Sequence, residues 1–418
     1  MISIEELHGR VLNQLDMTRD ISDDELTELI YEILQEVSRK EYLSLDQKTR
    51  MGRELFNAFR KLDLLQEFLE DDEVTEVMIN GTKAIFYEKT GRLYRSEKRF
   101  LSKDKLEDVI QQIVAGSNRL VNEASPIVDA RLADGSRVNV VLAPVAIDGP
   151  IVTIRKFAKE GITLEKLIAW NSIDRKTAEY LISLVVAGYN IFISGGTGSG
   201  KTTFLNALSE YIPKTERIIT IEDNAELQIR GVENLVRLEA RNANVEGFGA
   251  ISIRDLIKTA LRMRPDRIIV GEVRSDEAID MLQALNTGHD GSLSTGHANS
   301  PRDMLSRLET MVLMGMDLPL PAIQRQIASG VDIIVHLGRL RDRSRKLLEV
   351  VEILGYENGE IQLQTLIRHE EVEEKKGVIV SAWREIHELT NHSKLAAAGI
   401  DGVRAEVGGD CRCAARSS

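Results

Sequence analysis

Hydrophobic side chains near the N-terminus recur at the spacing of an amphipathic helix. Over residues 1–70 the chain is charged and poor in glycine, and Leu26, Ile30, Ile33 and Leu34 are separated by three or four positions or by one. Residues with this spacing share one face of a helix. The pattern therefore predicts an N-terminal helical region over residues 1–70.

Residues 71–157 change to short apolar runs that are typical of strands. A serine, Ser102, stands before an apolar 3.6-residue pattern and is suited to cap a helix there. Asn-Gly at 80–81 predicts a hairpin turn between the first two runs. This block is expected to be a small α+β domain with strands at 74–79, 84–87, 127–132, 138–143 and 151–155.

Strand-like and helix-like segments then alternate as far as about residue 355. Such alternation predicts a parallel sheet covered by helices. The block is expected to form an α/β domain over 173–370, joined to the preceding domain by a linker at 158–172. Residues 371–418 begin with an acidic run and end in small residues, so they are interpreted as a C-terminal tail.

Composition limits the class of protein and its compartment. A length of 418 residues allows two or three domains, and a net charge of −12 weighs against non-specific nucleic-acid binding. The cysteines are Cys411 and Cys413, so a disulfide framework is not expected and a cytoplasmic location is favoured. The start of the chain lacks the pattern of a secretory signal, and the apolar stretch at 181–193 is too short to span a bilayer. Association with a membrane is therefore expected only through partners.

A glycine-rich run between a predicted strand and a predicted helix carries the most specific signal. It satisfies the phosphate-loop pattern G-x-x-x-x-G-K-[ST], in which backbone N–H groups and a helix N-terminus face phosphate oxygens. Lysine brings a mobile positive charge to the outer phosphates, and the first threonine hydroxyl is suited to ligate Mg²⁺. The predicted nucleotide-binding residues are Gly195, Gly196, Thr197, Gly198, Ser199, Gly200, Lys201, Thr202 and Thr203, with Thr202 as the Mg²⁺ ligand.

Two further apolar strands end in carboxylates. Glu222 and Asp223 follow one strand, and Glu272 follows the other, where the carboxyl edge of a parallel sheet forms the binding edge. Glu272 is suited to polarise an attacking water. The first segment is suited to orient Mg²⁺ or water, although Asp223 in a helix or turn cap is an alternative.

A third segment contains two histidines, His289 and His297. Either histidine is suited to sense a phosphate or to orient a glutamate, and either is equally suited to a structural role. Neither cysteine ligands nor a pair of histidines four residues apart accompany them, so a zinc site is not favoured.

Taken together and in this order, the segments resemble the motifs of a known superfamily. The phosphate loop, "ITIEDNAEL", "RIIVGEVR" and "GSLSTGHANS" look like the Walker A motif, Asp box, Walker B motif and His box of the secretion ATPases. The longer runs "LRMRPDRIIVGEVR" and "VDARLADGSRVNVVLAP" are similar to the CpaF branch, the tight-adherence (Flp) pilus assembly ATPases. The resemblance covers residues of about 65 to 370.

The resemblance implies a RecA-like ATPase core preceded by a small PAS-like α+β domain. It also implies ATP and Mg²⁺ as ligands, Glu272 as the catalytic carboxylate, Glu222 as an Asp-box residue and His297 as the His-box residue. Gly296 stands where relatives usually carry leucine. Glu272 follows Gly271 rather than an aspartate, which matches the secretion branch.

Arginines in the preceding domain are further candidates. Arg131, Arg137 and Arg155 fall on neighbouring predicted strands, and relatives use arginines of the equivalent segments to neutralise charge on a transferring phosphoryl group. An arginine on a strand is otherwise usually solvated or in a weak surface pair. The basic run at 339–346 is most simply a solvated hairpin tip, with contact to lipid phosphates or an acidic partner as the alternative.

The expected function is ATP hydrolysis by a homohexameric motor that assembles a type IV pilus or drives a related secretion machine. Such a motor would lie at the inner face of the cytoplasmic membrane and act on a membrane platform protein. A RecA-like nucleic-acid translocase of the conjugation type is the alternative, against which the net charge of −12 argues. A nucleotide-sensing scaffold without turnover is a second alternative. It would be expected if Lys201 or Glu272 were missing, and both are present.

Overall fold

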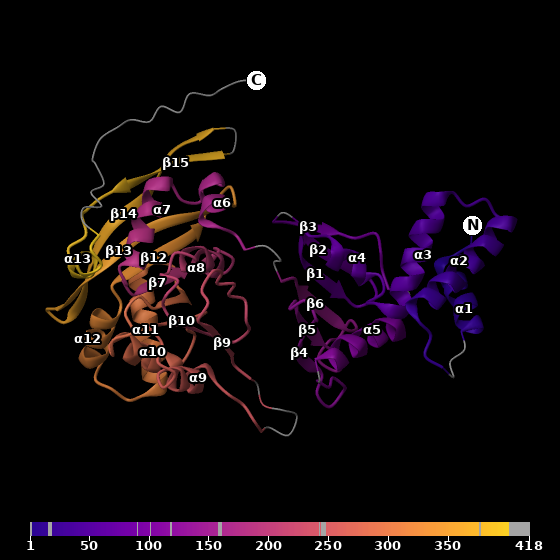
Figure 1. The fold of residues 1–418 in the computed structure, drawn as a ribbon, viewed down its shortest axis with the longest axis horizontal. Helices are drawn as coiled ribbons and strands as arrows, with labels where there is room; N and C mark the ends of the chain where they lie inside the picture. Colours follow the sequence, from indigo (N-terminus) through magenta and orange to yellow (C-terminus); the bar gives the residue numbers. More distant parts are fainter. Residues whose placement is uncertain are drawn as a thin grey trace. The chain divides into compact units, whose positions relative to one another are not determined.

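The chain forms two compact units, Met1–Lys159 and Glu160–Ser418, which are described separately (Figure 1). A computed structural model describes residues 2–15, 19–89, 91–100, 102–117, 119–157, 161–241, 243, 248–375 and 378–400. The parallel sheet predicted for residues 173–370 lies in the second unit.

Three amphipathic helices open the first unit, as predicted. They are α1 (Ile4–Gln14), α2 (Asp23–Lys40) and α3 (Leu45–Arg60). Ser22 and Ser44 form capping boxes that fix where α2 and α3 begin. The apolar stripe predicted on α2 is buried, because its side chains pack against those of α1 and α3.

A six-stranded antiparallel sheet forms the rest of this unit, in the order β3-β2-β1-β6-β5-β4. Helix α5 (Lys103–Gly116) packs its apolar side chains into the sheet core, and Ser102 caps it as predicted. Helix α4 (Leu65–Glu70) also belongs to this core, so the helical region gives way to the sheet domain before α4 and not at residue 70. The strands are β1 (Val74–Asn80), β2 (Ala84–Lys89), β3 (Arg92–Arg95), β4 (Ile127–Arg131), β5 (Arg137–Val141) and β6 (Ile151–Arg155).

A nine-stranded sheet organises the second unit, in the order β15-β14-β13-β12-β7-β11-β10-β8-β9. The six strands from β12 to β9 in this order run parallel, which confirms the predicted parallel sheet. These six are β7 (Ile191–Gly195), β8 (Ile218–Glu222), β9 (Leu235–Glu239), β10 (Arg267–Val270), β11 (Leu293–His297) and β12 (Ile333–Arg339). Three antiparallel strands extend one side, namely β13 (Arg345–Glu357), β14 (Glu360–Lys375) and β15 (Val378–Glu385).

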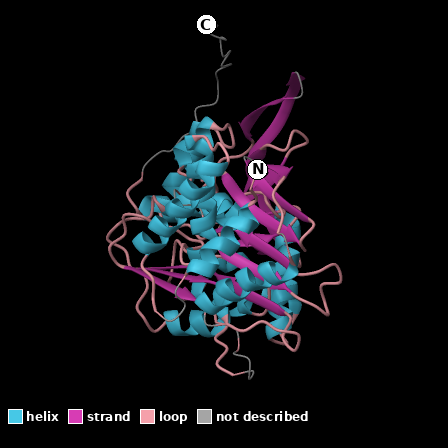
Figure 2. Ribbon diagram, turned by 90° about the vertical axis from the view of Figure 1, so that its right-hand side faces the viewer, coloured by secondary structure: helices cyan, strands magenta, loops and turns pink. Residues whose placement is uncertain are grey.

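Helices cover both faces of this sheet (Figures 1 and 2). One face packs against α6 (Leu164–Ala169), α7 (Arg175–Val186), α8 (Lys201–Ser209) and α13 (Ser393–Ala397). The other face packs against α9 (Ile253–Ala260), α10 (Glu277–Leu285), α11 (Pro301–Gly315) and α12 (Leu320–Gly330). Because both faces are covered, β7, β8 and β10 are buried along their whole length rather than alternating between buried and exposed residues. Helix α6 begins inside the segment predicted as a linker over 158–172.

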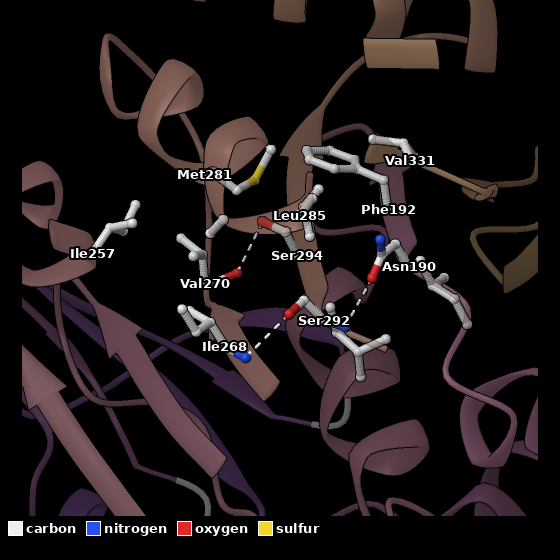
Figure 3. Close-up of a pocket in the computed structure, with 13 residues that line it drawn as sticks. Asn190, Phe192, Ile257, Ile268, Val270, Met281, Leu285, Ser292, Ser294 and Val331 are labelled. Atoms are coloured by element: carbon white, nitrogen blue, oxygen red, sulfur yellow. Dashed lines mark hydrogen bonds between the residues drawn. The ribbon is translucent and has the colours of Figure 1, made fainter. Parts of the chain in front are cut away.

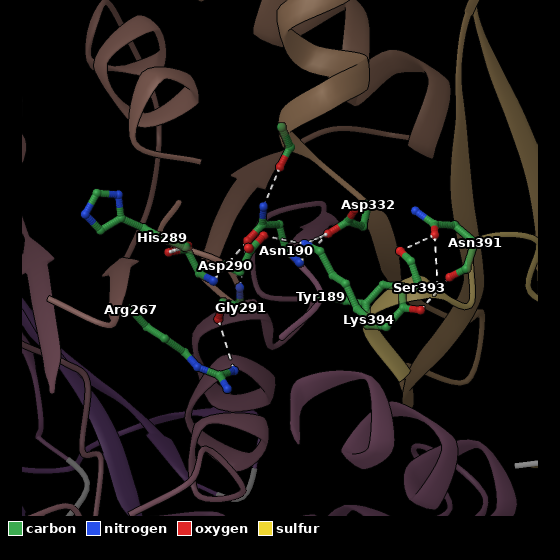
Figure 4. Close-up of polar contacts among 12 residues, drawn as sticks. Tyr189, Asn190, Arg267, His289, Asp290, Gly291, Asp332, Asn391, Ser393 and Lys394 are labelled. Atoms are coloured by element: carbon green, nitrogen blue, oxygen red, sulfur yellow. Dashed lines mark hydrogen bonds and ion pairs between the residues drawn. The ribbon is translucent and has the colours of Figure 1, made fainter. Parts of the chain in front are cut away.

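The segment predicted as a C-terminal tail contributes to the second unit. The boundary predicted at 371 falls inside β14, and β15 pairs with β14 along its length. Lys394 of α13 lies 2.7 Å from both Asp290 and Asp332, and the Tyr189 hydroxyl donates to the Asn391 carbonyl (Figure 4). These contacts hold residues 386–400 against the amino-terminal edge of the central strands, an arrangement that the acidic composition does not indicate.

Within the described residues, none of the helices has the length and apolar character needed to cross a membrane.

Candidate active site

The phosphate loop leaves the sheet at the carboxyl end of β7 and ends at the start of α8. Gly198 and Gly200 have φ of 72° and 95°, values that glycine adopts at little cost. A Cβ on Gly195 would lie 2.4 Å from the Leu337 carbonyl oxygen of β12, which no side chain could avoid. Thr202 and Thr203 lie half-buried in the first turn of α8. The loop therefore has the shape that the motif predicts. Its glycines carry no Cβ atoms that would crowd the backbone beside the first turn of α8.

Two polar groups of the loop fit a phosphate ligand. The Lys201 side chain is buried, and its Nζ donates to the Gly196 carbonyl at 3.1 Å and lies 3.2 Å from His297 Nδ1. Burial is the main reason that the pKa of Lys201 is lowered, and a bound anion would offset that penalty. The Ser199 hydroxyl is buried without a hydrogen-bond partner in the described part of the chain. The first hydroxyl of the helix, on Thr202, is an oxygen ligand of the kind that Mg²⁺ prefers.

Glu272 follows β10 and lies beside this lysine, as predicted. Its Oε1 is 2.9 Å from His297 Nε2, and its Oε2 accepts a hydrogen bond from Arg274 at 2.8 Å. The contact with His297 is close but not aligned as a hydrogen bond, so Oε1 lacks a donor among the described residues. Burial acts to raise the pKa of Glu272, but Arg274, His297 and Lys201 together hold it below its usual value. The carboxylate is thus ionised with one oxygen available to a water.

His297 ends β11 and connects the two groups. Its pKa is lowered, mainly by burial and then by the charge of Lys201, so the ring is neutral at pH 7. A neutral ring has one accepting and one donating nitrogen, which suits Nδ1 beside the Lys201 ammonium and Nε2 beside the Glu272 carboxylate. The structure therefore brings Lys201, His297 and Glu272 into one continuous polar cluster.

Glu222 ends β8 next to Gly271. Its Oε1 accepts from the backbone N–H groups of Glu226 and Leu227, each at 2.8 Å, and its Oε2 is buried without a partner among the described residues. Burial raises its pKa to about 7, against the opposing effect of those two hydrogen bonds. Glu222 therefore holds the turn after β8 and carries a carboxyl group that titrates near neutral pH.

Arg274 contacts two carboxylates of its own chain, with one nitrogen 2.8 Å from Glu272 and another 3.5 Å from Asp223. Asp223 is thereby an ion-pair partner rather than a cap. Both residues follow predicted strands, but the contact between their side chains depends on the pairing of β8 with β10.

The basic run at 339–346 forms the predicted hairpin between β12 and β13, and it lies beside the phosphate loop. Leu337 of β12 pairs with Gly195, and Arg345 of β13 has its Cδ 3.7 Å from where a Cβ on Gly200 would lie. Arg345 is exposed and stands directly opposite Arg339. The charge of this run is visible in the sequence, whereas its position beside the phosphate loop depends on the pairing of β12 with β7.

The three candidate arginines of the first unit form a row across neighbouring strands. Arg131 pairs in register with Arg137, and Arg137 pairs with Arg155, so all three side chains share one face of the sheet. Glu76 of β1 continues the row and lies 3.9 Å from Arg155. The placement of this row toward the phosphate loop remains a prediction.

Two other features are not parts of this site. His289 precedes β11 at the opposite edge of the sheet (Figure 4). Its Nδ1 lies 3.1 Å from the Ala284 carbonyl in the last turn of α10, so it has a structural role. A pocket between the sheet and helices α9 and α10 is lined by apolar and small polar side chains such as Phe192, Met281 and Ser294 (Figure 3). No charged residue lines it, so it does not suit phosphates.

Comparisons with known proteins show the family to which the chain belongs. The family model of the type II/IV secretion system protein matches residues 60–400. A putative conjugal transfer protein of Mycobacterium tuberculosis is 36% identical over 309 residues, 72% of this chain and 87% of that protein. The type IV secretion system protein PtlH of Bordetella pertussis is 33% identical over 303 residues, 66% of this chain and 89% of that protein.

A solved structure shows the same fold. The ATPase DotB of Yersinia pseudotuberculosis superposes with a TM-score of 0.52 at 20% identity, covering 71% of this chain and 79% of that one. The resemblance to the secretion ATPases noted from the motifs is confirmed, whereas the CpaF branch stays a prediction. The chain belongs to the type II/IV secretion system protein family.

Proposed function

We propose that the chain hydrolyses ATP and uses the energy to drive assembly of a type IV pilus of the tight-adherence kind, or a related secretion machine. The observation that carries the proposal is the polar cluster of Lys201, His297 and Glu272 beside the phosphate loop. It joins a phosphate-binding charge to an ionised carboxylate with one oxygen that lacks a donor.

The chemistry follows from these groups. The loop amides and Lys201 would hold the phosphates, and Thr202 would hold Mg²⁺, which supplies charge neutralisation on the phosphate oxygens when bound. Glu272 Oε1 would accept a proton of the attacking water and orient it. Neutral His297 would hold Lys201 and Glu272 at their present spacing, and Arg274 would keep Glu272 ionised.

The arginine row of the first unit would complete the site. Arg131, Arg137 and Arg155 form a positive face that a phosphate would stabilise, since charge-assisted bonds to phosphate oxygens are strong. Closure of the first unit over ATP and its release after hydrolysis would convert turnover into movement. Such a site, with groups from two units, is compatible with a homohexameric ring favoured by ATP and Mg²⁺.

The partner would be a platform protein in the membrane, with the motor peripheral to its cytoplasmic face. The net charge is −12, so the motor would repel a nucleic acid, and a protein partner suits it better. Light scattering with a non-hydrolysable ATP analogue tests the ring, and a species that remained monomeric at micromolar concentration would contradict it.

The hydrolysis is tested with two variants. Glu272→Gln keeps the size of the side chain and removes the charge that polarises water, so ADP and ATP affinity should persist while kcat falls by at least about 100-fold. Lys201→Ala should instead lose nucleotide affinity. Hydrolysis by the Glu272→Gln variant at the wild-type rate would show that this carboxylate is not catalytic.

A conjugation-type DNA transport motor is the alternative, and it rests on the name of the similar M. tuberculosis protein. That function predicts ATPase activity that rises with added single- or double-stranded DNA, with a steep dependence on salt. ATPase rates that DNA leaves unchanged would favour the protein-secretion or pilus function.

A further inference from the structure

A basic hairpin borders the phosphate loop on the side away from Glu272. The strands here follow one another in the order β13-β12-β7-β11-β10, and the loop continues β7. Glu272 follows β10 and His297 ends β11, so both lie on one side of the loop. The hairpin of residues 339–346 joins β12 to β13 at the same carboxyl edge, on the other side. A nucleotide held by the loop would therefore have the reacting groups on one side and this hairpin on the other.

Arg345 is the side chain of the hairpin that reaches the loop. Its Cδ lies 3.7 Å from where a Cβ on Gly200 would lie, and apart from the residues adjoining Gly200 no other described side chain comes within 4 Å of that position. Arg345 shares a strand face with Leu347, which packs in one core cluster with Phe204 of α8. Arg345 therefore lies on the face that α8 covers, beside the residue that precedes its first turn.

The charge of Arg345 is not neutralised by the protein. The side chain is exposed, and it forms neither an ion pair nor a hydrogen bond with the residues that the structure describes. Directly opposite it, Arg339 donates through Nε to the Arg343 carbonyl, and it too lacks a carboxylate partner within the described part of the chain. The hairpin thus places two positive charges near the loop, which an anion would stabilise.

The loop leaves room for such an anion. A Cβ on Gly196 or on Gly198 would meet nothing within 4 Å, and Gly200 begins α8 without a side-chain cap. The Ser199 hydroxyl is buried and has no partner among the described residues. Backbone N–H groups at the start of a helix attract phosphate oxygens. A phosphate bound there would lie within reach of the flexible Arg345 side chain.

The position of Arg345 favours the part of the nucleotide that ATP and ADP share. The bond that breaks would lie beside Glu272 and His297, which meet each other and Lys201 on the β11 side of the loop. Arg345 belongs to β13, two strands from β7 in the opposite direction. A charge that contacts substrate and product alike contributes to binding rather than to lowering the barrier.

We propose that Arg345 is a nucleotide-binding residue, which donates to an α- or β-phosphate oxygen common to ATP and ADP. The proposal rests on the proposed ATPase function, because that function places ATP in the phosphate loop. It gives Arg345 an effect opposite to that expected of Arg131 and Arg155, whose loss should lower kcat and spare ADP affinity. The competing view is that the hairpin is a solvated tip or a contact for anionic lipid.

The test titrates full-length variants with fluorescent ADP and measures their steady-state ATP hydrolysis. Arg345→Met keeps the length of the side chain and removes its charge, so the Kd for ADP and the KM for ATP should rise together by about tenfold or more, with kcat within about threefold of wild type. Arg345→Lys keeps the charge without the forked donors and should give intermediate values. Because Arg345 is exposed, the melting temperature without nucleotide should change by less than about 2 °C.

Arg343→Asn is the matched control. Arg343 is an exposed arginine of the same hairpin, and asparagine tolerates its positive φ of 68°. The substitution removes the same charge from the hairpin and should leave the Kd for ADP within about twofold of wild type. Equal losses of ADP affinity in Arg343→Asn and Arg345→Met would show a general effect of charge and overturn the proposal.

Three other outcomes are decisive. A wild type that binds ADP, with an Arg345→Met variant of the same affinity, would overturn the proposal. Binding of the wild type to phosphatidylglycerol vesicles that both variants lose, with ADP affinity unchanged, would overturn it in favour of a lipid contact. Weaker ADP binding by Arg345→Met alone, in a protein that does not hydrolyse ATP, would instead overturn the proposed function and support the role of Arg345 in nucleotide binding.

Discussion

Glu222 makes the stability of the second unit depend on pH in a direction opposite to that of most carboxylates. Its pKa rises from 4.5 to about 7, chiefly because of burial. Glu222→Gln keeps an oxygen that can accept from the N–H groups of Glu226 and Leu227, and it cannot ionise. The substitution therefore removes the titration with little change in shape.

The sign and size follow from linkage. A folded-state pKa above the unfolded value means that the folded chain binds the proton more tightly, so stability is greatest below pH 4.5 and is lost as pH rises through 7. With these two pKa values, the wild type loses about 2–3 kcal/mol of unfolding free energy between pH 5 and pH 8 through this group alone. The Glu222→Gln variant does not lose this free energy, because its side chain cannot ionise.

The assay compares urea unfolding or thermal melts of the two proteins, without nucleotide, at several pH values from 5 to 8. We expect the variant to gain about 2–3 kcal/mol relative to wild type across that range, or about 5–10 °C in melting temperature for a unit of this size. All other titrating groups are shared, so they cancel in the difference.

Parallel pH profiles for the two proteins would refute the reasoning, since they would show that Glu222 has the same pKa in the folded and unfolded chain. A difference that grew toward pH 5 would refute it as well, because it would require a lowered pKa and hence a carboxylate stabilised by its surroundings.

Three further sets of substitutions test other parts of the structure. Gly195→Ala should abolish nucleotide binding in filter or fluorescence assays, because its Cβ would lie 2.4 Å from the Leu337 carbonyl oxygen, and unchanged ADP affinity would contradict the loop geometry. Arg131→Ala, Arg155→Ala and Arg137→Thr should each lower kcat about 10- to 100-fold with ADP affinity kept, because each removes a charge that would contact the phosphate oxygens. Near-wild-type rates in all three variants would exclude them from catalysis. Lys394→Met should cost about 1–3 kcal/mol in denaturant unfolding by separating α13 from Asp290 and Asp332, whereas the same change at Lys176, in a more exposed pair with Glu385, should cost under about 1 kcal/mol.

Local patterns were enough to predict most elements and the phosphate loop. Apolar spacing located α2, Ser102 marked the start of α5, and apolar runs located the central strands. These features depend on residues within a few positions of one another, where side-chain periodicity and capping act. The order of strand, glycine loop, lysine and carboxylates was likewise sufficient to place Lys201, Glu222, Glu272 and His297 at one edge of a parallel sheet.

Contacts between distant residues were decided by the tertiary structure. The sequence contains Arg131, Arg137 and Arg155 as separate positions, and only strand register sets them side by side. Pairing of β7 with β12 brings His336 to Ser194 and the basic hairpin to the phosphate loop, across more than 130 residues of chain. Residues 378–400 look like a polar tail because their partners, Asp332 and Glu352 among them, lie on other strands. A single sequence records each side chain and its neighbours, whereas charge, burial and pKa depend on which strands become adjacent when the sheet forms.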